Sequence, residues 1–149
     1  MTHEDYMNQA LTLAREAAAH GEVPVGCVIV RDGKIIGRGR NRREEKQAVS
    51  SHAEMEAMAQ ANEVLGSWRL EDCDLYVTLE PCPMCAGAIL NARVRRVFYG
   101  ARDRAMGACG GVLNLFMEDF PQHPALVGGV LAEECRAVLT DFFRQLRRI

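Results

Sequence analysis

Two separate segments of the chain carry side chains that suit one metal ion, so the fold must bring them together. They are His52-Ala53-Glu54 and Pro81-Cys82-Pro83-Met84-Cys85. A structural zinc site closes its tetrahedron with four side chains, whereas a catalytic site keeps three and leaves one position for water. Because no fourth ligand lies close to either segment, the pattern predicts an open, catalytic zinc site formed by His52, Cys82 and Cys85.

Length and composition limit what surrounds this site. The chain has 149 residues, enough for one domain with a buried core and too few for two, so we expect a single zinc-dependent domain over residues 1–149. Apolar residues make up 48% and charged residues 26%, which is ordinary for a globular protein. The formal net charge of -2 gives no overall attraction to nucleic acid, so any RNA binding must depend on local basic clusters.

Arginines do cluster, although such clusters are more often solvated surface than phosphate-binding surface. They lie in three stretches: Arg38, Arg40, Arg42 and Arg43; Arg93, Arg95, Arg96, Arg102 and Arg104; and Arg144, Arg147 and Arg148.

The N-terminal residues do not have the basic and then apolar order of a signal peptide, because Glu4 and Asp5 make them acidic. No apolar run approaches the roughly 20 residues that cross a bilayer. We therefore expect a cytoplasmic protein without a membrane partner. In that compartment the six cysteines are thiols or metal ligands, and the four outside the motif (Cys27, Cys73, Cys109 and Cys135) are expected to be buried thiols.

The spacing of apolar residues predicts alternating helices and strands. Thr2 and Asp5 form a capping box for a first helix that ends near His20, before Gly21. The full predicted order is a helix to residue 20, strands at 23–30 and 35–38 joined by an Asp-Gly turn, a helix at 52–65, a strand at 75–79, a helix at 83–92, a strand at 96–100, a helix at 112–117, a strand at 125–130 and a helix at 131–147. Because strands separated by helices form parallel pairs, this order predicts a three-layer α/β/α domain with a mixed sheet of about five strands.

The local structure explains how the ligands reach one ion. Pro83 suits the first helical position, so Cys82 caps that helix and Cys85 lies on the same face one turn later. The positive end of the helix dipole there favours thiolates. His52 and Glu54 are two residues apart, which on a regular helix separates them by about 200°. Both face the metal only if His52 stands at or just before the start of its helix.

Two other interpretations of the cysteine pair remain open at this stage. A redox pair is one, but such pairs follow the first strand of a βαβ unit and give His52 and Glu54 no role. A closed structural zinc site is the other, and it needs a fourth ligand at a distance in the sequence. The candidates for that ligand are Cys73, Cys109, His20 and His123.

Glu54 indicates catalysis, since a carboxylate near a zinc ion but not bound to it has no structural duty there. Two thiolates cancel the formal charge of zinc, so bound water is less acidified than beside three neutral histidines and a nearby base becomes valuable. Glu54 is expected to take a proton from that water, deliver it to a ring nitrogen and later protonate departing ammonia.

The pattern H-x-E followed by P-C-x-x-C is the established signature of zinc deaminases that act on nucleobases. Beyond it, the chain resembles the bacterial tRNA-specific adenosine deaminases, of cytidine-deaminase-like fold, over nearly its whole length. The matching residues are Glu22-Val23-Pro24-Val25-Gly26, Asn41, His52-Ala53-Glu54, the run from Thr78 to Ala88, and Asp141-Phe142-Phe143-Arg144.

The resemblance implies hydrolytic conversion of adenosine to inosine at the wobble position of a tRNA anticodon, by a homodimer with one zinc ion per subunit. It implies that His52, Cys82 and Cys85 bind the zinc and that Glu54 transfers protons. It also implies that six further residues contact the RNA: Asn41, Val25, Ala53 and Pro81 around the flipped base, and Asp103 and Phe143 at neighbouring nucleotides of the anticodon loop.

Two stretches depart from the family pattern, namely Ala48-Val49-Ser50-Ser51 before the histidine and Gly110-Gly111, where Gly-Ser is usual. Neither departure includes a metal ligand. Both lie in loops that are expected to contact the RNA.

The last helix has an apolar stripe of Cys135, Val138, Leu139, Phe142 and Leu146, which we expect to face the core. Phe143 falls off this stripe, next to Arg144. An aromatic residue outside the apolar stripe could stack on an unpaired base of RNA. Periodicity alone is equally compatible with a contact in a dimer or with packing at the rim of the core.

Two other functions are compatible with part of this sequence pattern. Deamination of a free base or nucleotide uses the same zinc chemistry without the basic tail. A zinc-stabilised nucleic-acid-binding module without catalysis shares the ligands but gives Glu54 no role.

Overall fold

The computed structural model describes residues 1–147, so Arg148 of the third arginine stretch lies outside the described residues. Five strands form one mixed sheet in the order β2-β1-β3-β4-β5. The strands are β1 (Gly26–Arg31), β2 (Lys34–Arg40), β3 (Cys73–Leu79), β4 (Arg96–Ala101) and β5 (Ala125–Val127). The helical segments are α1 (His3–Ala19), α2 (Arg43–Lys46), α3 (Ala53–Leu65), α4 (Pro83–Ala92), the short 3-10 helix η1 (Leu115–Met117) and α5 (Ala132–Leu146).

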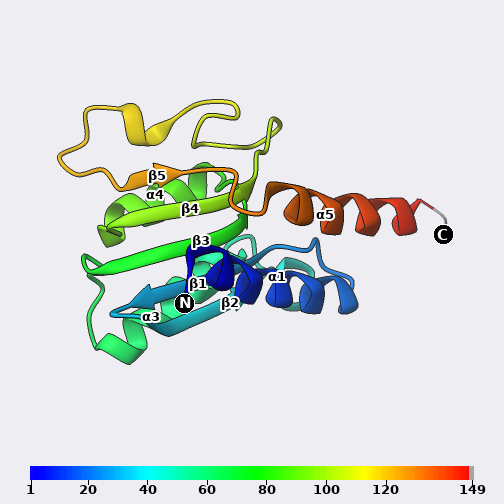
Figure 1. The fold of residues 1–149 in the computed structure, drawn as a ribbon, viewed down its shortest axis with the longest axis horizontal. Helices are drawn as coiled ribbons and strands as arrows, with labels where there is room; N and C mark the ends of the chain where they lie inside the picture. The colour runs from blue at the N-terminus through cyan, green and yellow to red at the C-terminus, as the bar shows by residue number, and fades with distance from the viewer. Residues whose placement is uncertain (148–149) are drawn as a thin grey trace.

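Strand β1 is antiparallel to both of its neighbours, β2 and β3, while β3, β4 and β5 are mutually parallel. Helices α3 and α4 cover one face of the sheet, and α1 and α5 cover the other (Figure 1). The predicted three-layer α/β/α architecture with a mixed five-stranded sheet is confirmed.

Glycines in β2 allow α3 to lie directly on the sheet. A Cβ atom at Gly39 would stand 2.3 Å from the carbonyl oxygen of Ala53, and one at Gly37 would stand 2.3 Å from that of Ala57. Any side chain at these positions would push the helix outward. The close approach fixes the first turn of α3, where His52 and Glu54 lie.

Local signals set several element boundaries as predicted. Helix α1 begins with a reciprocal capping box between Thr2 and Asp5. The turn between β1 and β2 has Asp32 at φ 50° and Gly33 at φ 75°, the left-handed pair that joins antiparallel strands tightly. Helix α4 has the predicted bounds, with Pro83 in its first turn and Cys82 as its cap.

Four predicted elements need correction. The helix predicted at 112–117 is only η1, which the Asn114 side chain caps through the N–H of Phe116. The strand predicted at 125–130 ends at Val127, before Gly128-Gly129, where Gly129 has a φ of 86°. The strand predicted from residue 23 begins at Gly26, after Pro24. Residues 41–51, whose polar composition predicts a loop between the strand at 35–38 and the helix at 52–65, contain the short helix α2.

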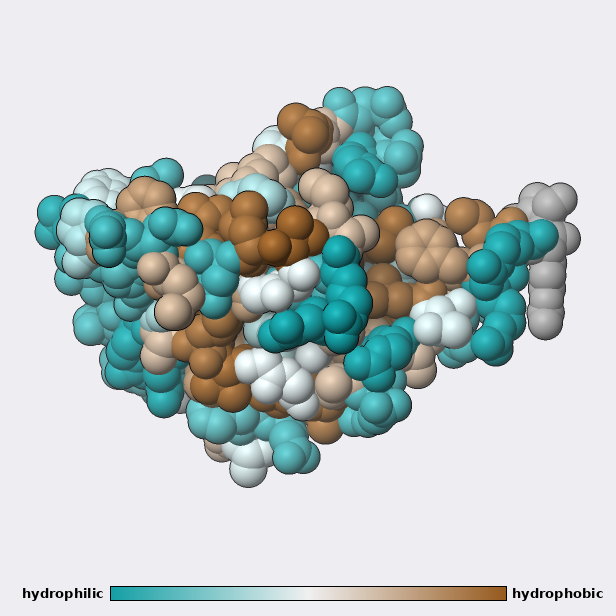
Figure 2. Space-filling view, turned by 90° about the horizontal axis from the view of Figure 1, so that it is seen from above, coloured by the Kyte–Doolittle hydropathy of each residue, from teal (hydrophilic) through white to brown (hydrophobic). Residues whose placement is uncertain are grey.

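The predicted core stripe of the last helix is only partly buried. Cys135 is fully buried, Val138, Leu139 and Phe142 are half-buried, and Leu146 is 54% exposed. The reason is visible in Figures 1 and 2, where α5 continues beyond the edge of the sheet and its far end stands clear of the body.

Seen from above, from the β5 side, the molecule also displays apolar side chains on its surface (Figure 2). Large apolar residues exposed in the segment before and within β5 are Val112, Leu113, Met117, Phe120 and Val127.

The topology gathers several chain segments at one edge of the sheet. Strands β2, β3 and β4 all end there, and the antiparallel β1 begins there. The helices that follow β2 and β3 start at the same edge, which lies at the right of the sheet in Figure 1. Crevices at the carboxyl ends of parallel strands are the common ligand sites of α/β folds. Within residues 1–147, no helix is long and apolar enough to span a membrane.

Candidate metal centre and active site

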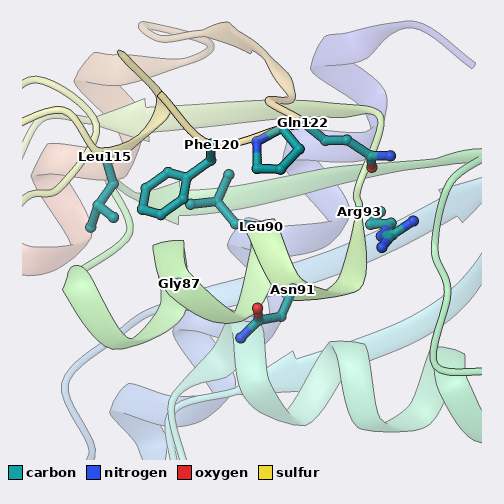
Figure 3. A pocket seen from close by; sticks show the side chains of 8 residues that line it. Gly87, Leu90, Asn91, Arg93, Leu115, Phe120 and Gln122 are labelled. Atoms are coloured by element: carbon teal, nitrogen blue, oxygen red, sulfur yellow. The ribbon is translucent and has the colours of Figure 1, made fainter. Parts of the chain in front are cut away.

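Two cavities of similar size differ in the chemistry they offer. One, of about 400 Å³, lies on the outer face of α4. Figure 3 shows Leu90, Leu115 and Phe120 around it, and its only ionisable lining residue is Arg93. The other, of about 430 Å³, lies at the edge where the strands end. Its lining residues are Val23, Val25, Asn41, Arg43, Val49, His52, Ala53, Glu54, Leu79, Glu80, Cys82, Pro83, Met84, Asp103 and Met106. The predicted metal ligands and Glu54 are in this second cavity, which we call the active-site pocket.

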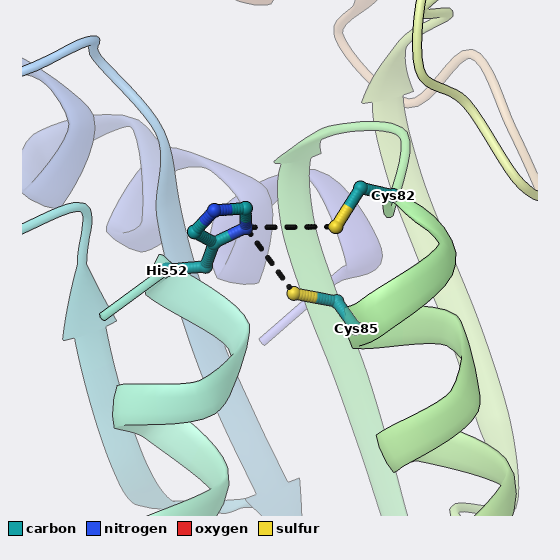
Figure 4. Close-up of side chains that lie close together, drawn as sticks. All are labelled: His52, Cys82 and Cys85. Atoms are coloured by element: carbon teal, nitrogen blue, oxygen red, sulfur yellow. Dashed lines mark hydrogen bonds between the residues drawn. The ribbon is translucent and has the colours of Figure 1, made fainter. Parts of the chain in front are cut away.

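Two helix N-termini hold the predicted metal ligands. His52 is the cap residue of α3, as its spacing from Glu54 requires, and Cys82 is the cap residue of α4 with Cys85 in the first turn. Figure 4 shows the two helices side by side with the imidazole facing both sulfurs. Both helix dipoles point their positive ends at the site, which favours thiolates there.

The distances between these atoms fit a zinc ion. His52 Nδ1 lies 3.6 Å from Cys82 Sγ and 3.5 Å from Cys85 Sγ. With usual Zn–N and Zn–S bond lengths, two ligands of a tetrahedral zinc stand about 3.5–3.6 Å apart. Hydrogen bonding from Cys85 lowers the pKa of the Cys82 thiol, against the effect of burial, and His52 adds to the lowering. The donor set therefore suits a divalent metal ion of zinc type.

A closed four-ligand site finds no support among residues 1–147. There the metal-ligating group consists of His52, Cys82 and Cys85 alone, with all three ligand atoms within 4.8 Å of one another. None of the four candidates for a further ligand belongs to this group. The arrangement leaves room for water or substrate, as a catalytic metal site requires.

Glu54 lies in the second position of α3 and lines the pocket, although its side chain is nearly enclosed, with the residue 4% exposed. Burial raises the pKa of Glu54 to about 7. A carboxyl group whose pKa lies near neutrality accepts and returns protons with little cost, which suits a general acid and base.

Four of the predicted substrate contacts line the same pocket: Val25, Asn41, Ala53 and Asp103. Asn41 is held by a hydrogen bond from its amide to the carbonyl of Val23, at 3.4 Å, and by one from the N–H of Arg43 to its oxygen, at 3.3 Å. Asp103 accepts the N–H groups of Ala105 and Met106 through Oδ1, at 3.0 and 3.1 Å. Both polar side chains are therefore fixed by their own loops.

The other two predicted contacts lie outside the pocket lining. Pro81 is buried, and its carbonyl accepts the N–H of Ala108 at 2.8 Å. Phe143 lies on α5, is 43% exposed and packs edge-on against Phe142 with ring centroids 5.3 Å apart.

Sequence reasoning missed several residues of the site. Arg43, Val49, Met84 and Met106 line the pocket, and Glu80 is a buried carboxylate at its base. Glu22, also buried, accepts the N–H groups of Glu44 and Glu45 at 3.1 and 2.7 Å and so holds α2 beside the pocket. The only signal for these two glutamates was that each lies within a stretch that matches the family, since burial of a carboxylate leaves no mark in local sequence.

Metal-dependent nucleobase deaminases combine this sheet with this ligand set, so the fold and the site assign the chain to that class of hydrolytic, cytidine-deaminase-like enzymes. The family described as MafB19-like deaminase matches residues 1–147. A tRNA-specific adenosine deaminase of Bacillus subtilis (strain 168) is 49% identical over 150 residues, which are 99% of this chain and 93% of the relative.

Two solved structures extend the comparison. One comes from a study of A-to-I editing by tRNA:A34 deaminases at the wobble position of transfer RNA. It matches with a TM-score of 0.87 at 43% identity, covering 91% of this chain and 99% of that one. A guanine deaminase of Bacillus subtilis matches with a TM-score of 0.66 at 35% identity, covering 81% and 88%. The chain belongs to the family of tRNA-specific adenosine deaminases.

Proposed function

We propose that the chain catalyses hydrolytic deamination of adenosine to inosine at the wobble position of a tRNA anticodon. The observation that carries the proposal is the convergence of His52, Cys82, Cys85 and the buried Glu54 in one pocket of a chain that shares 49% of its residues with a tRNA-specific adenosine deaminase. The identity of 35% to a guanine deaminase is lower, which favours the RNA substrate.

A single zinc ion per chain is part of this proposal. His52, Cys82 and Cys85 would hold it, and when bound it supplies a Lewis acid that makes water nucleophilic at neutral pH. The helix N-termini of α3 and α4 contribute by favouring the thiolate form of the two cysteines. We also propose that residues 1–149 make up one deaminase domain.

Glu54 carries the proton transfers. Its carboxylate accepts a proton from the attacking water and gives it to a nitrogen of the adenine ring as the C6–O bond forms. It then takes the remaining proton from the oxygen now bound to C6 and transfers it to the amino group, which leaves as ammonia when the C6–N bond breaks and the C6 carbonyl forms. Nearly complete burial keeps bulk water from competing for these protons.

The pocket offers a place for a base taken out of its stack. Val25 and Ala53 give apolar walls, and Asn41 gives an amide that is already oriented. Asp103 at the rim and Phe143 on α5 are proposed to meet neighbouring nucleotides. Pro81 remains a predicted contact, and its buried position suits support of the pocket base rather than direct stacking.

We further propose that two copies of the chain associate through the outer side of α4. Leu90, Leu115 and Phe120 contribute apolar side chains to a cavity there whose lining also includes Asn91, Arg93 and Gln122, and Phe120 is 44% exposed. Exposed apolar surface of this kind commonly marks an interface. The cytoplasmic location stays a prediction that rests on the tRNA substrate.

Deamination of a free base is the alternative function, favoured by the guanine deaminase among the similar structures. Incubation of the purified protein with an anticodon stem-loop bearing a wobble adenosine, and separately with adenine, guanine, cytosine and cytidine, decides between them. Ammonia release is measured for each substrate. We expect release from the stem-loop alone, and release confined to free bases or cytidine would contradict the proposal.

A further inference from the structure

Glu80 is a buried carboxylate that lines the pocket. Its side chain is 0% exposed and lies at the end of β3, two residues before Cys82. The Oε1 atom accepts the N–H of Asp103 at 3.0 Å. The Oε2 atom accepts the N–H groups of Cys109 and Gly111 at 2.9 and 2.8 Å. Three backbone donors from one segment, 103–111, thus converge on one side chain.

The segment is shaped to receive this carboxylate. A Cβ atom at Gly107 would stand 2.3 Å from both Glu80 Oε2 and the carbonyl oxygen of Asp103, and one at Gly111 would stand 2.8 Å from Oε1 and 2.0 Å from that carbonyl oxygen. Neither glycine has a positive φ, so the reason for glycine is space rather than backbone conformation. The guanidinium of Arg102 lies 4.0 Å from Oε1 and adds a positive charge beside the carboxylate.

The same stretch of chain joins the metal ligands to this segment. The N–H of Glu80 donates to the carbonyl of Ala101, and the carbonyl of Pro81 accepts the N–H of Ala108, both at 2.8 Å. Glu80, Pro81 and Cys82 therefore fix the metal site and the 103–111 segment relative to each other. Asp103 and Met106 of that segment line the pocket, and Met106 is 58% exposed at its rim.

We propose that Glu80 is a positioning residue that holds segment 103–111 at the rim of the active-site pocket, and that this hold determines how well a polynucleotide substrate binds. The inference rests on the proposed function for its substrate. The rim contacts nucleotides flanking the reacting base, whereas Glu54 and the metal ligands act on the base itself. Loss of the hold therefore weakens RNA binding more than it slows the chemical step.

The variant Glu80→Gln tests this, because glutamine has the same shape but replaces one of the two accepting oxygens with an NH2 group, which cannot accept an N–H. Exchange of the backbone amides of Asp103, Cys109 and Gly111 is followed by NMR. We expect exchange at least about tenfold faster at those of the three amides that face the NH2 group and so lose their accepting oxygen, with amides of β3 unchanged. In the same protein, zinc content should stay at one ion per chain and KM for the stem-loop should rise about tenfold with kcat within about threefold. A matched control is Glu118→Gln, an exposed carboxylate of the neighbouring segment, which should match the wild type.

Gly107→Ala provides a second route if Glu80→Gln does not fold. It keeps the carboxylate but places a methyl group against both Oε2 and the carbonyl oxygen of Asp103, and the same three amides should lose protection. Unchanged exchange at these amides in the variant that folds would overturn the proposal, and so would faster exchange with unchanged KM. A wild type that forms no inosine would instead overturn the proposed function, while the exchange rates would still show whether Glu80 holds the segment.

Discussion

At the residue scale, three buried glutamates surround the pocket and differ in how their charge is compensated. Glu22 and Glu80 accept backbone N–H groups, which is how buried carboxylates are usually satisfied. Glu54 faces the pocket beside Cys85 instead, and burial raises its pKa to about 7. The first two hold loops in place, and the third has the surroundings of a group that exchanges protons.

Replacing Glu54 separates proton transfer from metal binding. We expect Glu54→Ala to keep one zinc ion per chain and to lose at least about 10³-fold in kcat, because positioned proton transfer contributes on that order. Elemental analysis and single-turnover assays on the stem-loop measure the two quantities. Turnover close to that of the wild type would remove Glu54 from the mechanism.

Asp74 predicts a pH dependence of stability away from the active site. Burial opposes its ionisation, but hydrogen bonds from Arg96 and Arg95 outweigh burial and lower the pKa of Asp74. A pKa below the unfolded value of about 3.9 stabilises the fold fully above about pH 4, and the contribution is lost as the pH falls through the folded pKa.

Asp74→Asn should therefore reduce the free energy of unfolding by about 1–3 kcal/mol at pH 7, the scale of hydrogen bonds to a charged group. Urea titrations of both proteins at several pH values measure the difference, which should shrink below about pH 4. A difference that stays constant down to pH 3 would show that Asp74 does not carry this dependence.

At the scale of the elements, sequence predicted best where local signals decide the structure. The Thr2 capping box, the Asp32-Gly33 turn and Pro83 at the start of α4 act within a few residues, and their elements appear as predicted. The placement of His52 at a helix start also followed from its spacing to Glu54 alone.

Prediction failed where distant residues set the conformation. The segment after β4 was predicted to form a helix at 112–117, yet much of its course follows from Glu80, which lies 23 to 31 positions earlier in the chain. The core stripe predicted for α5 failed for a related reason, since periodicity does not show where the sheet beneath a helix ends. The ligands of the metal site were predictable from motif spacing, whereas Glu22, Arg43 and Met106 joined the site only through the tertiary fold.

Helix α5 carries the proposed RNA contact that lies farthest from the pocket lining. Phe143→Ala should raise KM for the stem-loop about tenfold, since stacking of one base on an aromatic ring contributes on that scale. The melting temperature and zinc content should not change, because the side chain is 43% exposed. Leu146→Ala, exposed on the same helix and without a ring, is the control. RNA kinetics equal to those of the wild type would assign Phe143 to packing.

At the scale of the whole molecule, the topology explains why dispersed residues form one site. Strands β2, β3 and β4 end at one edge, and β1 begins there. Residues that are far apart in the sequence, between Val23 and Met106, therefore line a single pocket. No single segment contains the chemistry, and α3 and α4 supply the metal ligands by starting at that edge.

Association of two chains is a prediction at this scale. Phe120→Asp replaces a partly exposed aromatic ring at the cavity on α4 with a charge, so it should shift the protein from dimer to monomer in light-scattering chromatography. Glu63→Gln, a change on the exposed surface of α3, should leave the molecular mass as in the wild type. A wild type that elutes as a monomer at all concentrations would contradict the proposed association.

Conversion of a wobble adenosine to inosine in RNA can be measured by mapping inosine in two anticodon stem-loops of equal composition. One carries adenosine at the wobble position, and the other has that adenosine moved one nucleotide along. We expect inosine at the wobble position of the first RNA and at least about 100-fold less in the second. Equal conversion of both RNAs, or conversion of neither by zinc-loaded protein, would contradict the proposed function.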